Sequence, residues 1–117
     1  MFERVISFVP PHIGLEGEFN TFRIGMKLHR QLKAGDFVSL LDTKDQAIFG
    51  RAQVISTDMG TLAEMCAIHS PNNHSEIPST DKQNSPARLF ALVQKLYGPH
   101  IAGFHKKTSV IYLKRIE

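Results

Sequence analysis

The residues best suited to chemistry in this sequence are Thr21 and Arg23, which are separated by a single residue. The segment around them, Phe19 to Ile24, is rich in β-branched and aromatic residues and is predicted to be a strand. In a strand the two side chains point to the same face. A hydroxyl beside a guanidinium can bind an anion or polarise a carbonyl group. The alternative is that both are exposed strand residues paired with their neighbours.

A second candidate group lies in the link before the C-terminal segment and consists of His100, His105, Lys106 and Lys107. Imidazole and ammonium groups can contact phosphate, and Gly103 nearby would permit close approach of the backbone. Phe104 offers a surface on which a base could stack. The alternative interpretation is a solvated turn with no ligand.

Cys66 and His69 have the spacing of neighbours on one face of a helix. Such a pair could share a metal ion or act as a nucleophile and its base. Both residues, however, continue an apolar stripe with Leu62 and Met65, which is typical of a buried helix face. A zinc site also needs more ligands than this pair supplies. We therefore expect Cys66 to be structural, and we expect no metal and no cofactor.

Charge is distributed unevenly along the chain. The formal net charge is only +3 at pH 7, but no acidic residue occurs from Phe19 to Gly35 or from Lys82 to Ile116. The acidic residues gather instead between Asp36 and Asp81. This asymmetry favours a polyanionic partner. The alternative is a soluble domain that is simply basic, with a pI near 9.2.

Length and composition fit one domain over residues 1–117, with 42% hydrophobic residues available for a core. Cys66 is the only cysteine, which excludes an intrachain disulfide and predicts no disulfide-linked partner. No apolar run approaches the roughly 20 residues of a membrane helix. Glu3 and Arg4 interrupt the N-terminal apolar segment, which is therefore unlike a secretory signal. These features predict a cytoplasmic protein without a membrane partner.

Five segments are predicted to be strands from their apolar and β-branched content. They are Val5 to Val9, Phe19 to Ile24, Phe37 to Leu41, Ala47 to Thr57 and Thr108 to Ile116. Gly50 predicts a bulge or a close backbone approach in the fourth segment. Because the last segment is apolar on both faces, it should insert among the earlier strands, which favours a closed or nearly closed sheet. Residues 26–32 fit either a helical turn or an irregular excursion.

Two helices are predicted between the fourth and fifth strands. Thr61 and Glu64 have the spacing of a capping box, and Pro71 should end the helix that they begin. Ser85 followed by Pro86 should begin the second helix, with Ser85 as its cap. The buried stripe predicted for the second helix consists of Leu89, Leu92, Val93 and Leu96.

The segment between these helices, Ser70 to Asn84, is rich in serine, asparagine, proline and charged residues. A loop of that length is unusual in a small domain and is often functional or disordered. We expect this segment to be mobile and to act as a flap over the cleft beside Thr21.

Three short motifs in this order resemble the ASCH domain, which belongs to the PUA-like group of small β-barrels. They are Thr21-Phe22-Arg23, Lys33-Ala34-Gly35-Asp36 and Gly50-Arg51-Ala52-Gln53-Val54. The resemblance covers roughly residues 3 to 116, which is nearly the whole chain. It implies an α+β fold in which a small barrel of about five or six strands is flanked by two helices. It also implies a cleft beside the Thr21–Arg23 strand, and known members bind RNA or act on modified nucleosides.

In length and helix arrangement the chain most resembles the small bacterial acetylcytidine amidohydrolases, whose strand carries Lys-Thr-x-Thr-x-Arg. Thr21 and Arg23 match that motif, whereas Glu18 and Phe19 occupy the lysine and first threonine positions. Ser70 stands where the family has a glutamate after the first helix. A threonine nucleophile needs a neighbouring base or an activating cation. The resemblance therefore leaves both an enzyme and a binding module open.

From these features we expect an ASCH-like module that binds RNA or a nucleotide-like anion in a basic cleft. The expected lining is Thr21, Arg23, Lys27, Arg30, Lys33, Arg51, His105, Lys106 and Lys107. The alternative is a hydrolase of the acetylcytidine amidohydrolase or ribonuclease kind with Thr21 as its catalytic residue. A third interpretation is a protein-interaction module whose basic face meets an acidic partner.

Overall fold

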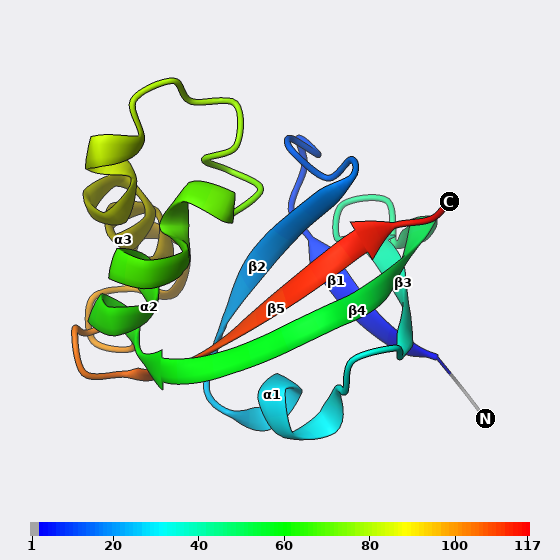
Figure 1. The fold of residues 1–117 in the computed structure, drawn as a ribbon, viewed down its shortest axis with the longest axis horizontal. Helices are drawn as coiled ribbons and strands as arrows, with labels where there is room; N and C mark the ends of the chain where they lie inside the picture. The colour runs from blue at the N-terminus through cyan, green and yellow to red at the C-terminus, as the bar shows by residue number, and fades with distance from the viewer. Residues whose placement is uncertain (1–2) are drawn as a thin grey trace.

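The computed structural model describes residues 3–117 as a strongly curled five-stranded sheet with helices packed at one end (Figure 1). The strands are β1 (Arg4–Phe8), β2 (Glu18–Ile24), β3 (Phe37–Asp42), β4 (Ala47–Thr61) and β5 (Lys107–Arg115). The predicted α+β fold is confirmed: the expected small barrel of five or six strands is a curled half-barrel of five, and each predicted strand is present.

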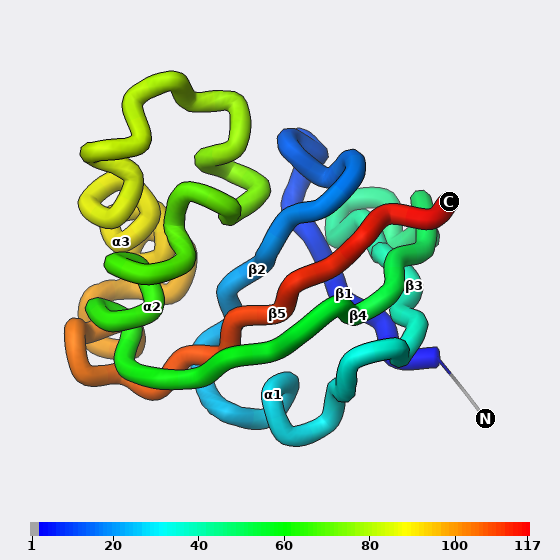
Figure 2. Tube along the Cα trace, viewed as in Figure 1, coloured from blue at the N-terminus to red at the C-terminus, as the bar shows by residue number. Residues whose placement is uncertain are grey.

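The strand order is β1-β3-β4-β5-β2, so the two N-terminal strands form the edges of the sheet. β1 pairs with β3 in parallel, whereas the other neighbours are antiparallel. The last strand lies between β4 and β2, as its two apolar faces predicted. The curl of the sheet brings the edges toward each other, and Arg23 Nη2 donates to the Ser7 carbonyl at 2.6 Å across the gap. We call this gap between β1 and β2 the seam (Figure 2).

Two irregularities help β4 to bend around the curl. Leu40 pairs with Gly50 and Leu41 with Ile48, which leaves Phe49 as the extra residue of a bulge next to Gly50. A second shift occurs between Val54 and Ser56 in the pairing with β5. The predicted bulge near Gly50 is confirmed. β4 also continues to Thr61, beyond the predicted end at Thr57, because β5 supplies pairing partners along this whole length.

Three α-helices complete the fold: α1 (Lys27–Gln31), α2 (Leu62–His69) and α3 (Ser85–Tyr97), with 3₁₀ turns at Ser70–Asn72 and Lys82–Asn84. The ambiguous segment after β2 is therefore a short helix. The capping box of α2 is formed: Glu64 N donates to Thr61 Oγ1, and Thr61 N donates to Glu64 Oε1, both at 3.2 Å. None of the helices within residues 3–117 combines the length and the apolar character needed to span a bilayer.

Two details of α3 differ from prediction. Its N-cap is Asn84 rather than Ser85, because the buried Ser85 hydroxyl donates to Glu76 at 2.6 Å. Leu89 and Val93 are buried as expected, but Leu96 is 58% exposed. The C-terminal half of α3 lines an open pocket at the seam together with residues of β1 and β2, so Leu96 faces this pocket instead of the core.

The sheet separates two hydrophobic cores. One lies inside the curl and includes Phe8, Phe19 and Leu40. The other lies between the sheet and helices α2 and α3 and includes Phe22 and Cys66. Since residues alternate along a strand, Thr21 and Arg23 share the inner face of β2 with Phe19.

Cys66 is expected to resist thiol reagents in the native protein. It is 2% exposed, and burial raises the pKa of its thiol to about 11, so almost no thiolate is present at neutral pH. His69, one helical turn after Cys66, instead makes hydrogen bonds of 2.7 Å to the Tyr112 hydroxyl and to the Asp58 carboxylate. Labelling should appear only after the chain is unfolded in denaturant. Rapid labelling of the folded protein would contradict a structural role for this cysteine.

Candidate functional site

A pocket of about 520 Å³ opens at the seam. Its walls are residues 7–11 and Ile13 next to β1, residues 21–23 of β2, residues 73–75, and one side of α3. This volume is in the usual range for small-molecule sites. A wider recess of about 750 Å³ lies elsewhere, but it is lined by Glu3 and Asp36 and by none of the predicted ligand-binding residues. The seam pocket is therefore the better candidate for binding an anion.

Arg23 is the cation of the pocket. Its guanidinium carbon lies 4.9 Å from the centroid of the Phe8 ring, and its Nη2 is bonded to Ser7. Its Nε is buried and has no hydrogen-bond partner among residues 3–117. Burial lowers the pKa of the guanidinium and Tyr97 raises it, but an arginine stays charged at neutral pH. A buried charged donor without an acceptor is costly, so it is suited to meeting a ligand oxygen.

Thr21 lies beside Arg23 on the same face and is 2% exposed. The residue lines the pocket. No aspartate or glutamate is among the described residues that line this space. A carboxylate base for Thr21 is therefore missing from the described walls, where the titratable side chains besides Arg23 are His74 and Tyr97.

His74 is held in one tautomer by the backbone. Its Nδ1 donates to the Ile13 carbonyl at 3.2 Å, which leaves Nε2 as an acceptor. The ring packs at right angles against Phe8 and Phe19. Burial lowers the pKa of His74 to about 4, and the charge of Arg23 lowers it while the Ile13 carbonyl raises it. The ring is thus neutral at physiological pH and presents a lone pair rather than a second charge.

Residues 73–75 are fixed against β2 by a set of contacts between Asn73 and Asn20. Asn73 forms a bridge with Asn20, its Nδ2 donates to Asn20 Oδ1 at 3.3 Å, and His74 N donates to the Asn20 carbonyl at 3.1 Å. Gly14 packs so closely on the other side that a Cβ there would lie 2.0 Å from the His74 carbonyl oxygen. This part of the predicted flap is therefore a packed wall of the pocket, and its motion stays a prediction.

The remainder of the same segment is tied to α3 through Glu76. The buried carboxylate accepts hydrogen bonds from Ser85 Oγ at 2.6 Å and from Arg88 Nη2 at 2.7 Å. Burial raises the pKa of Glu76, but the hydrogen bonds from Arg88 and Ser85 outweigh it and leave the pKa below its usual value. Glu76 does not line the pocket, and it anchors the wall instead of facing a ligand.

The structure divides the predicted ligand-binding residues among three places. Thr21 and Arg23 line the pocket. Arg51 lies on β4, where it pairs with Glu3 and, at 3.7 Å, with Glu117. The other six are exposed and lie outside the pocket walls: Lys27, Arg30, Lys33, His105, Lys106 and Lys107.

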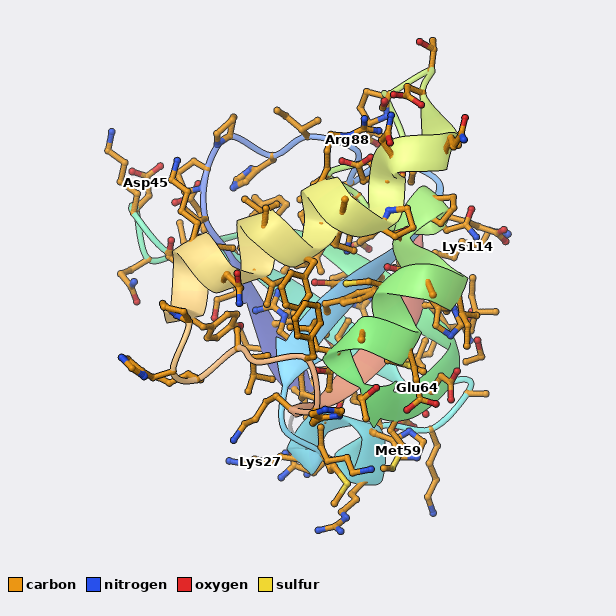
Figure 3. The ribbon with its side chains drawn as sticks, turned by 90° about the vertical axis from the view of Figure 1, so that its left-hand side faces the viewer. Lys27, Asp45, Met59, Glu64, Arg88 and Lys114 are labelled. Atoms are coloured by element: carbon orange, nitrogen blue, oxygen red, sulfur yellow. The ribbon has the colours of Figure 1, made fainter. Side chains whose placement is uncertain are left out.

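Most of the exposed cations share one end of the molecule. Gly25 N, just before α1, donates to the Lys107 carbonyl at 2.7 Å, and His29 N donates to Ser109 Oγ at 3.3 Å. These contacts bring Lys27 and its helix next to residues 105–107. Figure 3 shows Lys27 projecting from α1 below α2 and α3. We call His105, Lys106, Lys107, Lys27 and Arg30 the basic end.

Sequence reasoning did not place His74 in this pocket, and it missed the whole apolar wall contributed by α3. Leu92, Leu96 and Tyr97 line the pocket because α3 crosses the open seam. No sequence motif includes His74, and it becomes a candidate only because the fold places it in the same pocket as Thr21. Leu96 is exposed because it belongs to this pocket wall and not to the core.

No protein-family model and no curated protein sequence matches this chain. Solved structures with a similar fold include a point mutant of ZmASCH from Zymomonas mobilis. The two structures superpose with a TM-score of 0.53 and 13% sequence identity, and the match covers 98% of this chain and 73% of that chain. The chain has an ASCH-like fold.

A protein of the DUF984 family from Enterococcus faecalis V583 has a TM-score of 0.57 and 6% identity over 89% of this chain. This chain matches 64% of that protein's length, which is less than two thirds. At such low identities the likeness concerns the ASCH-like fold alone. The fold implied by the three sequence motifs is thereby confirmed.

Proposed function

We propose that this ASCH-like domain binds a nucleotide unit of RNA in the seam pocket. The observation that carries the proposal is the buried Arg23 Nε, a charged donor without a partner among residues 3–117, in a pocket with no described acidic wall. A phosphate or carbonyl oxygen of the ligand would satisfy this donor. Carboxylates in the wall would repel such a ligand, and the described lining residues include no aspartate or glutamate.

The rest of the pocket suits a nucleobase. Phe8, Phe22, Leu92 and Tyr97 provide apolar and aromatic surface against which a flat ring can pack. The Thr21 hydroxyl can donate or accept, whereas neutral His74 accepts at Nε2. Together with Arg23 these groups offer both donors and an acceptor, as the edge of a base requires.

The second candidate function is a hydrolase that uses Thr21. It is favoured by the presence of the threonine hydroxyl and the His74 imidazole in the same pocket. However, the pKa of about 4 makes His74 a weak base at neutral pH, since an effective general base has a pKa close to the working pH. For this reason we place binding ahead of hydrolysis.

The decisive experiment combines binding and turnover on the same protein. Isothermal titration with uridine monophosphate, inorganic phosphate and short single-stranded RNA should show that both nucleotide ligands bind more tightly than phosphate. Incubation with acetylcytidine should give no cytidine above background.

Acetylcytidine hydrolysis that disappears in Thr21→Ala would overturn the binding assignment and establish the hydrolase. Thr43→Ala, which changes a threonine outside the pocket, is the matched control for this variant. Absence of binding to every nucleotide tested would also refute the proposal and would favour an acidic protein partner for the basic end.

A further inference from the structure

A stacked pair of phenylalanines lies on the surface beside the pocket. The rings of Phe90 and Phe104 are 4.5 Å apart between centroids and nearly parallel, at 13°. Phe90 packs against the core that lies between the sheet and helices α2 and α3, whereas Phe104 is 62% exposed. One face of the Phe104 ring therefore rests on Phe90, and the exposed ring extends the stack outward toward solvent.

The backbone holds Phe104 in place. Its carbonyl accepts from Ala63 N at 3.0 Å, and the Lys106 carbonyl accepts from Leu62 N at 2.8 Å. The first turn of α2 thus clamps the segment on both sides of His105. A ring that is fixed before binding loses little conformational freedom when a ligand stacks on it.

The charge around Phe104 suits an anionic chain. The next three residues are His105, Lys106 and Lys107, and no acidic residue occurs between Lys82 and Ile116. Glu64 at the start of α2 stays negatively charged, because hydrogen bonds from Thr61 lower its pKa, and the positive charge of Lys107, which lowers it further, offsets that charge. An exposed aromatic ring beside clustered cations is the usual arrangement for binding single-stranded nucleic acid.

The stack is also continuous with the seam pocket. Phe90 lies two helical turns before Tyr97 on the same side of α3, which separates them by about 10 Å along the helix axis. Tyr97 lines the pocket and Phe90 carries the stack, so both features lie along the same side of α3. A single strand could occupy both at once.

We propose that Phe104 is a stacking platform for a second base of the same single-stranded RNA, with the basic end holding the phosphates that follow. This inference rests on the proposed function, because it extends the strand whose first nucleotide occupies the seam pocket. Stacking is tolerant of base identity, so the platform adds affinity and length dependence more than sequence preference.

The absence of tryptophan from the chain permits a direct test. In Phe104→Trp the new indole is a unique fluorescent reporter that keeps an aromatic stack. An oligouridylate of roughly six nucleotides should quench it strongly, whereas uridine monophosphate, which fills only the pocket, should leave it nearly unchanged. The matched control is Ile68→Trp, at a residue that is 60% exposed on α2 and should not respond to either ligand.

Affinity provides the second measurement. Phe104→Ala should weaken binding of the oligouridylate about 10-fold or more and leave the affinity for uridine monophosphate unchanged. If the oligouridylate binds no more tightly than the mononucleotide, or quenches both reporters equally, the platform is refuted while the pocket stands. If neither ligand binds, the proposed function itself fails.

Discussion

Replacing Arg23 with glutamine should weaken the binding of uridine monophosphate about 10- to 150-fold. The reason is the loss of a hydrogen bond to a charged group, which contributes about 1.5–3 kcal/mol. Glutamine retains a polar amide and most of the side-chain length, so the measured loss reports mainly the charge and the Nε donor. Isothermal titration of the variant against the wild type measures this difference.

Two controls separate binding from folding, because Arg23 also joins β1 to β2 through Ser7. Arg51→Gln removes an arginine that pairs with Glu3 and Glu117 outside the pocket, and its affinity for the mononucleotide should equal that of the wild type. Thermal unfolding followed by circular dichroism should show that Arg23→Gln is folded at the temperature of the titration. A folded Arg23→Gln protein that binds as tightly as the wild type would remove Arg23 from the site.

Replacing Gly14 with alanine should damage both stability and binding. Gly14 has a φ of +70°, where an L-residue costs about 1–2 kcal/mol. The new Cβ would also lie 2.0 Å from the His74 carbonyl oxygen, so the wall of the pocket must move, at a cost of about 1–3 kcal/mol more. Urea unfolding should therefore show a loss of about 2–5 kcal/mol, and mononucleotide affinity should fall because His74 is displaced.

Gly17→Ala is the matched control for this change. Gly17 has a similar φ of +64°, but its added Cβ would meet no atom within 4 Å. It should therefore show the backbone cost without the clash, and its affinity for the mononucleotide should be unchanged. Equal losses of stability and binding in the two variants would show that contact with His74 is unimportant.

Local sequence pattern determined most of the secondary structure. The strands were predictable because alternating and β-branched residues suit a pleated surface, and the start of α2 because Thr61 and Glu64 satisfy each other's backbone N–H groups. Even the insertion of β5 between β4 and β2 followed from its two apolar faces, which had to be covered on both sides. The ASCH-like fold was likewise implied by short motifs in the right order.

The failures concern contacts with residues outside the segment whose pattern was interpreted. Ser85 is not a helix cap because the buried Glu76 carboxylate takes its hydroxyl. Leu96 was expected in the core, but it is 58% exposed and lines the pocket at the seam. Such outcomes depend on which groups meet in space, and propensity and periodicity within one segment contain no information about that.

The candidate site shows the same division. The sequence alone determined that Thr21 and Arg23 share one face of a strand, since side chains alternate with a period of two. Only the tertiary structure decided that Arg51 on β4 is paired with two acids from the ends of the chain. It likewise decided that the exposed cations next to α1 and β5 form a separate basic end and that His74 lines the seam pocket. The physical reason is that the curl of the sheet sets these distances: it brings β1 within reach of Arg23 and lets residues 73–75 and α3 close over the gap.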